Sequence, residues 1–297
     1  MKNKVCLVTG ATSGIGRATA KALAAQGAEV FVLVRSRDKG EVLLQELARE
    51  TGNARAGMPE LGQRRSSCRP QLHLLVGDLA KQADIRRVAA EFLATGKPLH
   101  VLVNNAGVIN MQLRHSPDGI EEMFAVNHLG YFLLTELLRP RLLQSAPARI
   151  VSVSSGAHAF IKGLQLDDLD FQRSGFATFK VYGHSKLCNL LWNRELARQL
   201  QGSGVTANCL HPGAVGTGLG NQNAVWARYV TRLLRPFFRT PERGASSSIY
   251  LASSPEVEGR SGDYWYDCKP IQPKPWAQDD AAARELWSFS ARLTGIA

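Results

Sequence analysis

The sequence predicts an α/β fold in which a doubly wound parallel sheet carries helices on both of its faces. Short runs of Val, Leu and Ile alternate with amphipathic stretches of helical length through most of the 297 residues. These runs lack the polar alternation of half-exposed strands, which indicates parallel strands that are buried on both faces. The first run also leads straight into a glycine-rich turn, as is typical of the first strand of such a sheet.

Six apolar runs have the length of a strand, at residues 5–9, 29–34, 71–76, 100–103, 149–153 and 206–210. Seven stretches are expected to form helices, at residues 15–26, 39–51, 83–93, 119–143, 182–201, 243–252 and 280–293. No internal repeat or linker divides the chain, and 44% of its residues are hydrophobic, which suits one large core. We therefore expect a single domain over residues 1–297.

Two stretches interrupt this alternation. Residues 53–70 are polar and basic and contain Gly and Pro, so we expect a loop insertion there. Residues 223–240 combine aromatic and aliphatic side chains with four arginines. This stretch fits a helix docked on the core, an apolar lid over a lipophilic substrate, or a surface in peripheral contact with a membrane. We predict a lid on the substrate side.

The composition argues against several classes of function. The net charge is +11, but no basic ladder with interleaved aromatic residues accompanies it, so we expect no nucleic-acid partner. The seven histidines show no metal-ligand spacing, which predicts no metal site. The sequence also lacks the G-x-S-x-G elbow of a serine hydrolase.

Signals for export or membrane insertion are not expected. No segment approaches the ~20 apolar residues that span a bilayer. The first apolar run begins at residue 5, which leaves no room for a signal peptide. The five cysteines are scattered, as is usual in a reducing compartment. We therefore expect a cytoplasmic protein.

The turn after the first strand carries Gly10, Gly14 and Gly16. A strand, a glycine turn and a helix together present free backbone N–H groups and the positive end of a helix dipole to a phosphate. Glycine permits the close approach that a pyrophosphate needs. The alternative is a tight connection with no ligand, but we interpret the turn as a dinucleotide site.

The side chains after the second strand favour NADP(H) over NAD(H). An acidic residue there accepts a hydrogen bond from the ribose of NAD, whereas an arginine accommodates the 2′-phosphate of NADP. Arg35 follows the strand, and no carboxylate occurs before Asp38. Arg17 directly follows the glycine turn and is expected to reach the same phosphate. The alternative is that both arginines are merely exposed at helix starts.

Polar residues follow the third and fourth strands, at the edge where an open parallel sheet binds its ligands. Asp78 and Leu79 come after one strand, and Asp78 is suited to accept from an adenine amino group. Asn105, Ala106 and Gly107 come after the other, where the backbone can approach the adenosine. Either motif alone also fits an Asx turn.

Tyr182 and Lys186 are four residues apart in a helical stretch, so their side chains share one face. A tyrosine with a pKa of about 10 is a poor base at neutral pH. An ammonium about 4–5 Å away is expected to lower that pKa by roughly 2–3 units. The pair then suits general acid–base catalysis.

Three further positions complete the expected site. Ser155 ends the fifth strand and is suited to bind a substrate oxygen, although the sequence leaves Ser154 open as the alternative. Asn127 is a polar residue at a buried helical position, where it would hold a water that relays protons to Lys186 or satisfy a backbone carbonyl. After the sixth strand, a Pro-Gly turn leads to Thr217, which is suited to bond a carboxamide.

The motifs TGATSGIG, GDL, NNAG, VSVSS, YGHSK and HPGAVGT occur in this order. The ordered set resembles the short-chain dehydrogenase/reductase family over residues 4–255, and the surrounding stretches are most similar to its retinol dehydrogenase branch. The resemblance implies a Rossmann-type sheet of about seven strands. Membrane-bound members of that branch carry an N-terminal hydrophobic anchor, which we do not expect in this chain. The stretch at 53–70 is also longer than the connection that is usual in the branch.

The resemblance also implies roles for individual residues. Tyr182 would be the catalytic acid/base, Lys186 would tune it and bind ribose, and Ser155 would orient the carbonyl. The catalytic set is Asn127, Ser155, Tyr182 and Lys186. The cofactor-binding set, from the residue arguments and the resemblance together, is Gly10, Ser13, Gly14, Ile15, Gly16, Arg17, Arg35, Asp78, Leu79, Asn105, Ala106, Gly107, Tyr182, Lys186, Pro212, Gly213, Val215 and Thr217.

These observations predict an NADP(H)-dependent oxidoreductase that interconverts an alcohol and its aldehyde or ketone. The apolar stretch at 223–240 favours a lipophilic substrate, with retinol and retinal among the candidates. The alternatives are a non-catalytic NADPH-binding regulator on the same fold, or a sugar-nucleotide epimerase. The sequence leaves the oligomeric state open.

Overall fold

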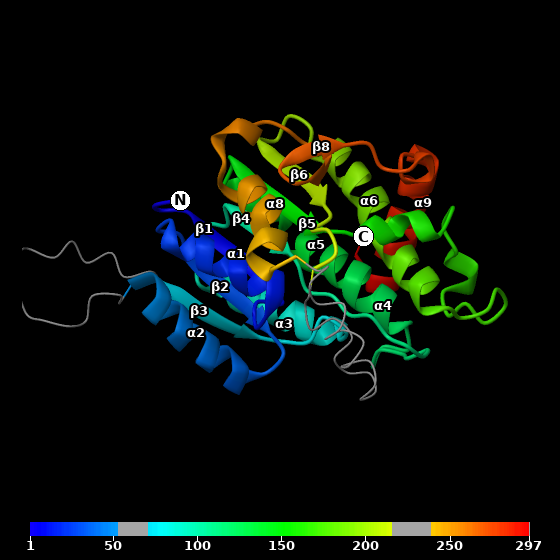
Figure 1. Cartoon of the computed structure of the whole chain (residues 1–297), viewed down its shortest axis with the longest axis horizontal. Helices are drawn as coiled ribbons and strands as arrows, with labels where there is room; N and C mark the ends of the chain where they lie inside the picture. Colours follow the sequence, from blue (N-terminus) through cyan, green and yellow to red (C-terminus); the bar gives the residue numbers. More distant parts are fainter. Residues whose placement is uncertain (53–70, 216–238, 297) are drawn as a thin grey trace, which may run out of the picture.

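The computed structural model describes residues 1–52, 71–215 and 239–296. The expected insertion at 53–70 and all but the last two residues of the expected lid lie outside these residues. In the described part, eight strands form one sheet in the order β3-β2-β1-β4-β5-β6-β7-β8 (Figure 1). The strands are β1 (Val5–Thr9), β2 (Glu29–Val34), β3 (Leu72–Val76), β4 (Val101–Asn104), β5 (Ala148–Val153), β6 (Val205–Leu210), β7 (Tyr264–Tyr266) and β8 (Lys269–Ile271).

All strand pairs from β3 through β7 are parallel, and β8 alone pairs antiparallel with β7. The prediction of a parallel sheet is therefore confirmed, and the six predicted strands agree with the structure within one residue at each end. Strands β7 and β8 were not predicted, because each has only three residues.

The helices alternate with the strands, as predicted. They are α1 (Gly14–Ala25), α2 (Arg37–Gly52), α3 (Gln82–Ala94), α4 (Glu122–Phe124), α5 (Gly130–Gln144), α6 (Thr178–Gln199), α8 (Pro241–Ser253) and α9 (Asp280–Thr294). Short helical turns are η1 (Ala125–Leu129), η2 (Gly156–Phe160), η3 (Leu166–Asp168), η5 (Pro255–Val257) and η6 (Pro275–Ala277).

The helix expected at 119–143 is not uniform. It begins as α4, widens into a π-helical turn at η1 and continues as α5. The N–H of Gly130 donates to the carbonyl of Ala125, five residues back, instead of four. Asn127 lies in this wide turn and is fully buried, in agreement with the expectation of a buried polar position.

Successive residues of the central strands face different helical layers. Cys6 and Val8 of β1 pack in a core formed with α1, α2 and α8. Leu7 packs in a second core formed with α3, α5, α6 and α9. Figure 1 shows the two layers on opposite faces of the sheet. This arrangement is why the strands contain apolar residues without alternation.

The chain order reverses between β1 and β4, which lie side by side with Val8 opposite Val103. Connections from neighbouring strands diverge at such a point and open a crevice beyond the carboxyl ends of the strands. The glycine turn after β1 and the Asn105–Gly107 turn after β4 both lie at this edge. The fold thus brings the predicted site motifs to one place.

Candidate active site

The glycine turn after β1 is packed tightly against the turn after β4. A Cβ atom on Gly10 would lie 2.7 Å from the Cα of Ala106, and Gly10 has a φ of +66°. A Cβ atom on Gly16 would lie 2.4 Å from both the Asn105 Nδ2 and the Gly10 carbonyl oxygen. Any larger residue at these two positions would push the two turns apart.

The amino end of α1 is open toward the crevice. Ser13 is its exposed N-cap residue, but the Ser13 side chain makes no capping hydrogen bond. The first turn, which begins at Gly14, contains no acidic residue. Its N–H groups are therefore available to an anion, and the helix dipole favours a negative charge there. This cradle fits the diphosphate of a dinucleotide.

Arg17 does not point to a free site. Its guanidinium lies 3.0 Å from a carboxylate oxygen of Glu46 and 2.6 Å from one of Glu50, both on α2. The two ion pairs raise the pKa of Arg17 and tie α1 to α2. The expectation that Arg17 reaches a 2′-phosphate stays a prediction, and in the structure two carboxylates of α2 hold its charge. Arg35 is exposed directly after β2, and among the described residues it forms no ion pair.

The residues after β3 and β4 mainly brace the local backbone. The Oδ1 of Asp78 accepts from the N–H of Ala80 at 3.0 Å, which makes the Asx turn that the sequence left open. Leu79 is buried, and a Cβ on Gly130 would meet it at 3.1 Å. The Nδ2 of Asn105 donates to the Thr9 carbonyl at 2.8 Å and so links β4 to β1.

The two serines after β5 have different surroundings. Ser154 is buried and its hydroxyl donates to the Lys186 carbonyl at 2.8 Å. Ser155 is half-buried, and its hydroxyl lies close enough to the Tyr182 phenol to lower the pKa of that phenol. The Oγ of Ser155 also accepts from the N–H of Ala157 at 3.1 Å, which begins η2. Ser155 is therefore the serine that faces Tyr182, a point that the sequence alone left open.

Tyr182 and Lys186 lie on one face of α6, as their spacing predicts. The Lys186 Nζ is 5.7 Å from the Tyr182 ring centroid and donates to the Val153 carbonyl at 3.0 Å. Burial raises the pKa of Tyr182 to about 12, and the Ser155 hydroxyl opposes this rise. Burial lowers the pKa of Lys186 to about 8.

The expected lowering of the Tyr182 pKa by Lys186 is wrong for the protein without cofactor. The spacing of the two residues predicts a fully charged ammonium beside the phenol. In the structure Lys186 is buried and Tyr182 is partly buried, and the loss of solvent around them disfavours the phenolate and the ammonium alike. Tyr182 is consequently a protonated phenol at neutral pH, which is the form that donates a proton.

Asn127 is connected to Tyr182 through Ser185, which the sequence analysis did not single out. The Asn127 Oδ1 accepts from the N–H of Val108 at 2.8 Å. Its Nδ2 donates to the Val108 carbonyl and to the Ser185 hydroxyl, both at 3.0 Å. The Ser185 hydroxyl in turn donates to the Tyr182 carbonyl at 2.8 Å. The Asn127 side chain thus satisfies backbone groups, the alternative that the sequence left open.

The chain after β6 is held by an aromatic stack. The His211 ring lies parallel to the Tyr266 ring, with 4.2 Å between centroids, and Arg239 packs on the same tyrosine ring. A Cβ on Gly213 would lie 2.8 Å from the Nε of Arg239, and Arg239 is also paired with Asp267. Sequence reasoning missed this cluster, because Arg239 and Tyr266 are distant from His211 along the chain.

The remaining predicted positions lie in or directly after this turn. Pro212 is half-buried between His211 and Gly213. Val215 bridges to Arg239, and a Cβ on Gly244 would touch both Val215 and the buried Ile15. Thr217 lies outside the described residues. The structure therefore brings Ile15 and Val215 together, next to the glycine turn.

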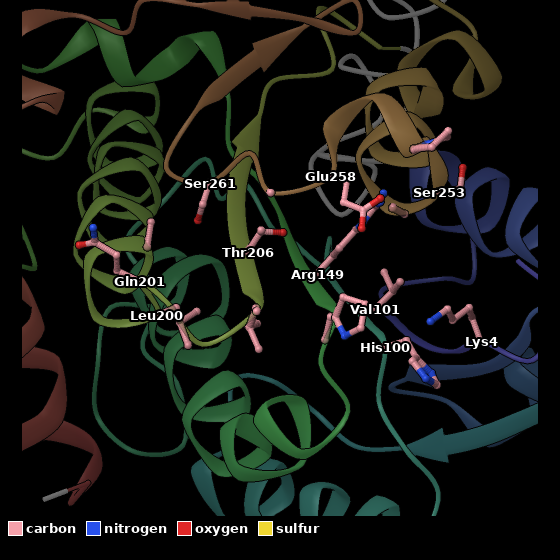
Figure 2. A pocket seen from close by; sticks show the side chains of 18 of the residues that line it. Lys4, His100, Val101, Arg149, Leu200, Gln201, Thr206, Ser253, Glu258 and Ser261 are labelled. Atoms are coloured by element: carbon pink, nitrogen blue, oxygen red, sulfur yellow. The ribbon is translucent and has the colours of Figure 1, made fainter.

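A groove of about 910 Å³ lies at the opposite edge of the sheet (Figure 2). Its walls include His100, Arg149 and Thr206, from the amino ends of β4, β5 and β6. The Arg149 guanidinium donates to the carbonyls of Leu251 and Ser254 and so closes the end of α8. None of the residues predicted for the site lines this groove in the described part of the chain.

Known proteins are similar to this chain over its whole length. Human retinol dehydrogenase 14 is 43% identical over 100% of this chain and 88% of its own length. Mouse retinol dehydrogenase 12 is 41% identical over 99% of this chain and 87% of its own length. Within the described ranges, every helix is too short or too polar to cross a membrane.

Solved structures and a family model agree with these relatives. A crystal structure of an uncharacterised protein from Mycobacterium paratuberculosis superposes with a TM-score of 0.74, at 30% identity over 99% of this chain and 94% of that one. A short chain dehydrogenase structure from Pseudomonas syringae superposes with a TM-score of 0.66, at 28% identity over 89% of this chain and 94% of that one. Residues 4–163 match the family model for short chain dehydrogenases. The chain therefore belongs to the short-chain dehydrogenase family of nicotinamide-dependent alcohol and carbonyl oxidoreductases, in the branch of the retinol dehydrogenases.

Proposed function

We propose that this chain is an NADP(H)-dependent oxidoreductase that interconverts a lipophilic alcohol and its aldehyde or ketone. The observation that carries the proposal is the meeting of the Ser155 and Tyr182 hydroxyls above β5, with Lys186 one helical turn from Tyr182. A substrate oxygen within reach of both hydroxyls has one group to orient it and one to exchange its proton.

In the direction of reduction, Tyr182 gives its proton to the carbonyl oxygen of the substrate. The hydride for the carbonyl carbon would come from a reduced nicotinamide whose diphosphate the glycine turn and the amino end of α1 would hold. The high pKa of Tyr182 keeps that proton in place until the oxygen gains negative charge. Ser155 holds the oxygen beside the phenol, and the Lys186 ammonium stabilises the phenolate that remains.

Arg35 supports NADP(H) over NAD(H). It is exposed at the carboxyl end of β2, where the ribose next to adenine lies in such folds. No Asp or Glu directly follows the strand to repel a 2′-phosphate. An arginine without a carboxylate partner can offer its planar donors to a phosphate.

Exposed apolar side chains on the elements that carry or follow the catalytic hydroxyls support a lipophilic substrate. Phe160 and Phe179 are each 61% exposed, and their rings meet edge to face with 6.3 Å between centroids. Phe160 ends η2, the turn that begins after Ser155, and Phe179 lies three residues before Tyr182 on α6. Relatives named as retinol dehydrogenases also support an apolar alcohol. Membrane contact through 223–240 stays a prediction.

The test compares wild type with Tyr182→Phe. Retinal, aliphatic and aromatic aldehydes, steroids and quinones are offered, and oxidation of NADPH is followed. We expect wild type to turn over at least one lipophilic carbonyl, and Tyr182→Phe to lose at least about 100-fold in kcat, because it lacks the proton donor. NADPH binding, measured by fluorescence titration, should be unchanged.

Tyr250→Phe is the matched control, because the Tyr250 hydroxyl donates to Glu256 on the surface, away from Ser155. It should retain wild-type turnover. Full activity of Tyr182→Phe, or binding of NADPH by wild type without turnover of any substrate class, would contradict the proposal.

A further inference from the structure

Tyr131 is a second buried phenol in the site, and the catalytic roles proposed above do not use it. It is the second residue of α5, directly after the wide turn that contains Asn127, and it is fully buried. Its hydroxyl donates to the Ala106 carbonyl at 2.7 Å, across from α5 to the turn after β4. That turn is the one against which Gly10 packs.

The Tyr131 ring also faces Lys186. The Lys186 Nζ lies 5.7 Å from the Tyr131 ring centroid, the same distance as from the Tyr182 ring. The other groups around the ammonium are the Val153 carbonyl of β5, the Cys209 thiol of β6 and the Asn127 amide near Gly107. In the described chain, Lys186 forms no ion pair with a carboxylate. The two rings and one carbonyl are thus the groups that favour its charge.

This surrounding is unusual for a buried ammonium. A buried charge without a carboxylate partner is costly, and the group tends to lose its proton instead. The face of an aromatic ring attracts a cation, most strongly when the cation is desolvated. Burial also raises the pKa of Cys209, so its thiol stays neutral and contributes no negative charge.

We propose that Tyr131 is a positioning residue for this site: its ring holds the Lys186 ammonium and its hydroxyl holds the Ala106 turn. The inference rests on the proposed function for its catalytic meaning, but the two contacts exist without cofactor or substrate. It adds a residue on α5 that acts through Lys186 and through the turn after β4. The ring contacts Lys186 and the hydroxyl contacts Ala106, so different substitutions of Tyr131 can test the two contacts separately.

The experiment first measures the titration of Lys186 by NMR of the cofactor-free protein with labelled lysine, assigned through Lys186→Met. We expect a value of about 8 for wild type, because burial lowers the pKa of Lys186. Tyr131→Phe keeps the ring and should leave that pKa unchanged. Tyr131→Leu removes the ring and should lower it by about one unit, because the charged form loses its cation–π contact.

The second measurement is the Kd for NADPH by fluorescence titration. Tyr131→Phe frees the Ala106 carbonyl and should weaken binding about three- to tenfold, with no change in the Lys186 titration. Replacement of Tyr131 with trifluorophenylalanine keeps the shape of Tyr131→Phe but weakens the ring's negative face. It should lower the Lys186 pKa relative to Tyr131→Phe, even if Tyr131→Leu fails to fold.

Equal Lys186 titrations in Tyr131→Phe and in the fluorinated variant would overturn the role of the ring. An unchanged NADPH Kd in Tyr131→Phe would overturn the role of the hydroxyl. Neither result depends on turnover, so a failure of the inference is distinguishable from a failure of the proposed function.

Discussion

Two arginines that the sequence treats alike have different surroundings, and this difference leads to a prediction at the scale of one residue. Arg35 forms no ion pair in the described chain, whereas Arg17 is held by Glu46 and Glu50. We expect Arg35→Asp to raise the Kd for NADPH about 10- to 100-fold, because it removes a charge-assisted contact and adds repulsion. Binding of NADH should improve or stay the same. Fluorescence titration with both cofactors measures the ratio.

Arg17→Ala is the control for this prediction. Loss of the Arg17 side chain should weaken the contact between α1 and α2. It should lower the thermal stability only slightly, because exposed ion pairs contribute little. The ratio of NADPH to NADH affinity should hardly change. The assignment of the 2′-phosphate to Arg35 fails if Arg17→Ala reverses the cofactor preference and Arg35→Asp does not.

Residue identity and spacing predicted where Tyr182 and Lys186 lie, because positions four apart on a helix share a face. They could not predict how burial changes the pKa of Tyr182, since burial depends on segments far along the chain. The choice between Ser154 and Ser155 also needed the structure. Neighbouring residues point in opposite directions, and only the position of α6 decides which one meets Tyr182.

At the scale of the element, a buried carboxylate begins the helix that carries Asn127. The Glu121 side chain accepts from the N–H groups of Met123 and Phe124, at 2.9 and 2.6 Å. It is 1% exposed, and burial raises its pKa to about 7, with smaller contributions from Asp170 and Glu122. In the unfolded chain the same carboxyl titrates near 4.5.

The folded protein therefore keeps a proton on Glu121 that the unfolded chain releases between pH 4.5 and 7. The stability from this group is full below pH 4.5 and is lost as the pH rises through 7. Between pH 5 and 7 the free energy of unfolding of wild type should fall by about 2–3 kcal/mol because of this group. Glu121→Gln should remove that fall. Denaturant titrations at several pH values measure it.

Glu122→Gln is the matched control for Glu121→Gln. Glu122 is the next residue, but it is only partly buried and accepts from the Asn110 side chain. Its substitution should leave the pH dependence of unfolding close to that of wild type. If both variants keep the wild-type slope, Glu121 does not retain its proton in the folded protein.

The wide turn at η1 marks the limit of prediction from periodicity. The apolar pattern at 119–143 predicts a helix, and a helical rod is present. A π-helical turn inserts one residue without changing the composition, so no pattern indicated it. Yet this turn sets the direction of Asn127 toward Val108 and of Tyr131 toward Ala106. The element was predictable, and its functional irregularity was not.

At the scale of the whole molecule, the order of strands and glycine turns predicted the sheet and the edge that holds the site. Parallel strands with crossover helices have few possible arrangements, so local patterns determine this part of the fold. The C-terminal region was harder to predict. The positions of β7 and of α9 depend on contacts with β6 and α6, which are remote in sequence.

The C-terminal helix α9 is part of the core that supports the site. Its Ala283, Leu286, Ser290 and Thr294 are buried. The Ser290 hydroxyl lies 2.8 Å from the Nε2 of His128 in the wide turn, and Trp287 packs edge to face on Phe132. Burial lowers the pKa of His128 to about 3, so this hydrogen bond involves a neutral ring at all working pH values.

We therefore expect removal of residues 279–297 to abolish cooperative folding. The buried Leu286 of α9, together with the partly buried Trp287, Phe289 and Leu293 packed on the same core, contributes on the order of 5 kcal/mol, at roughly 1.5–3 kcal/mol for a fully buried apolar side chain. That amount is comparable with the whole stability of a typical domain. Ser290→Ala is the matched control: it keeps the helix and loses one hydrogen bond, so it should cost about 1 kcal/mol. Thermal unfolding followed by circular dichroism measures both. A truncated chain that unfolds at the wild-type temperature would show that the site is supported without α9, and that the contact with His128 is incidental.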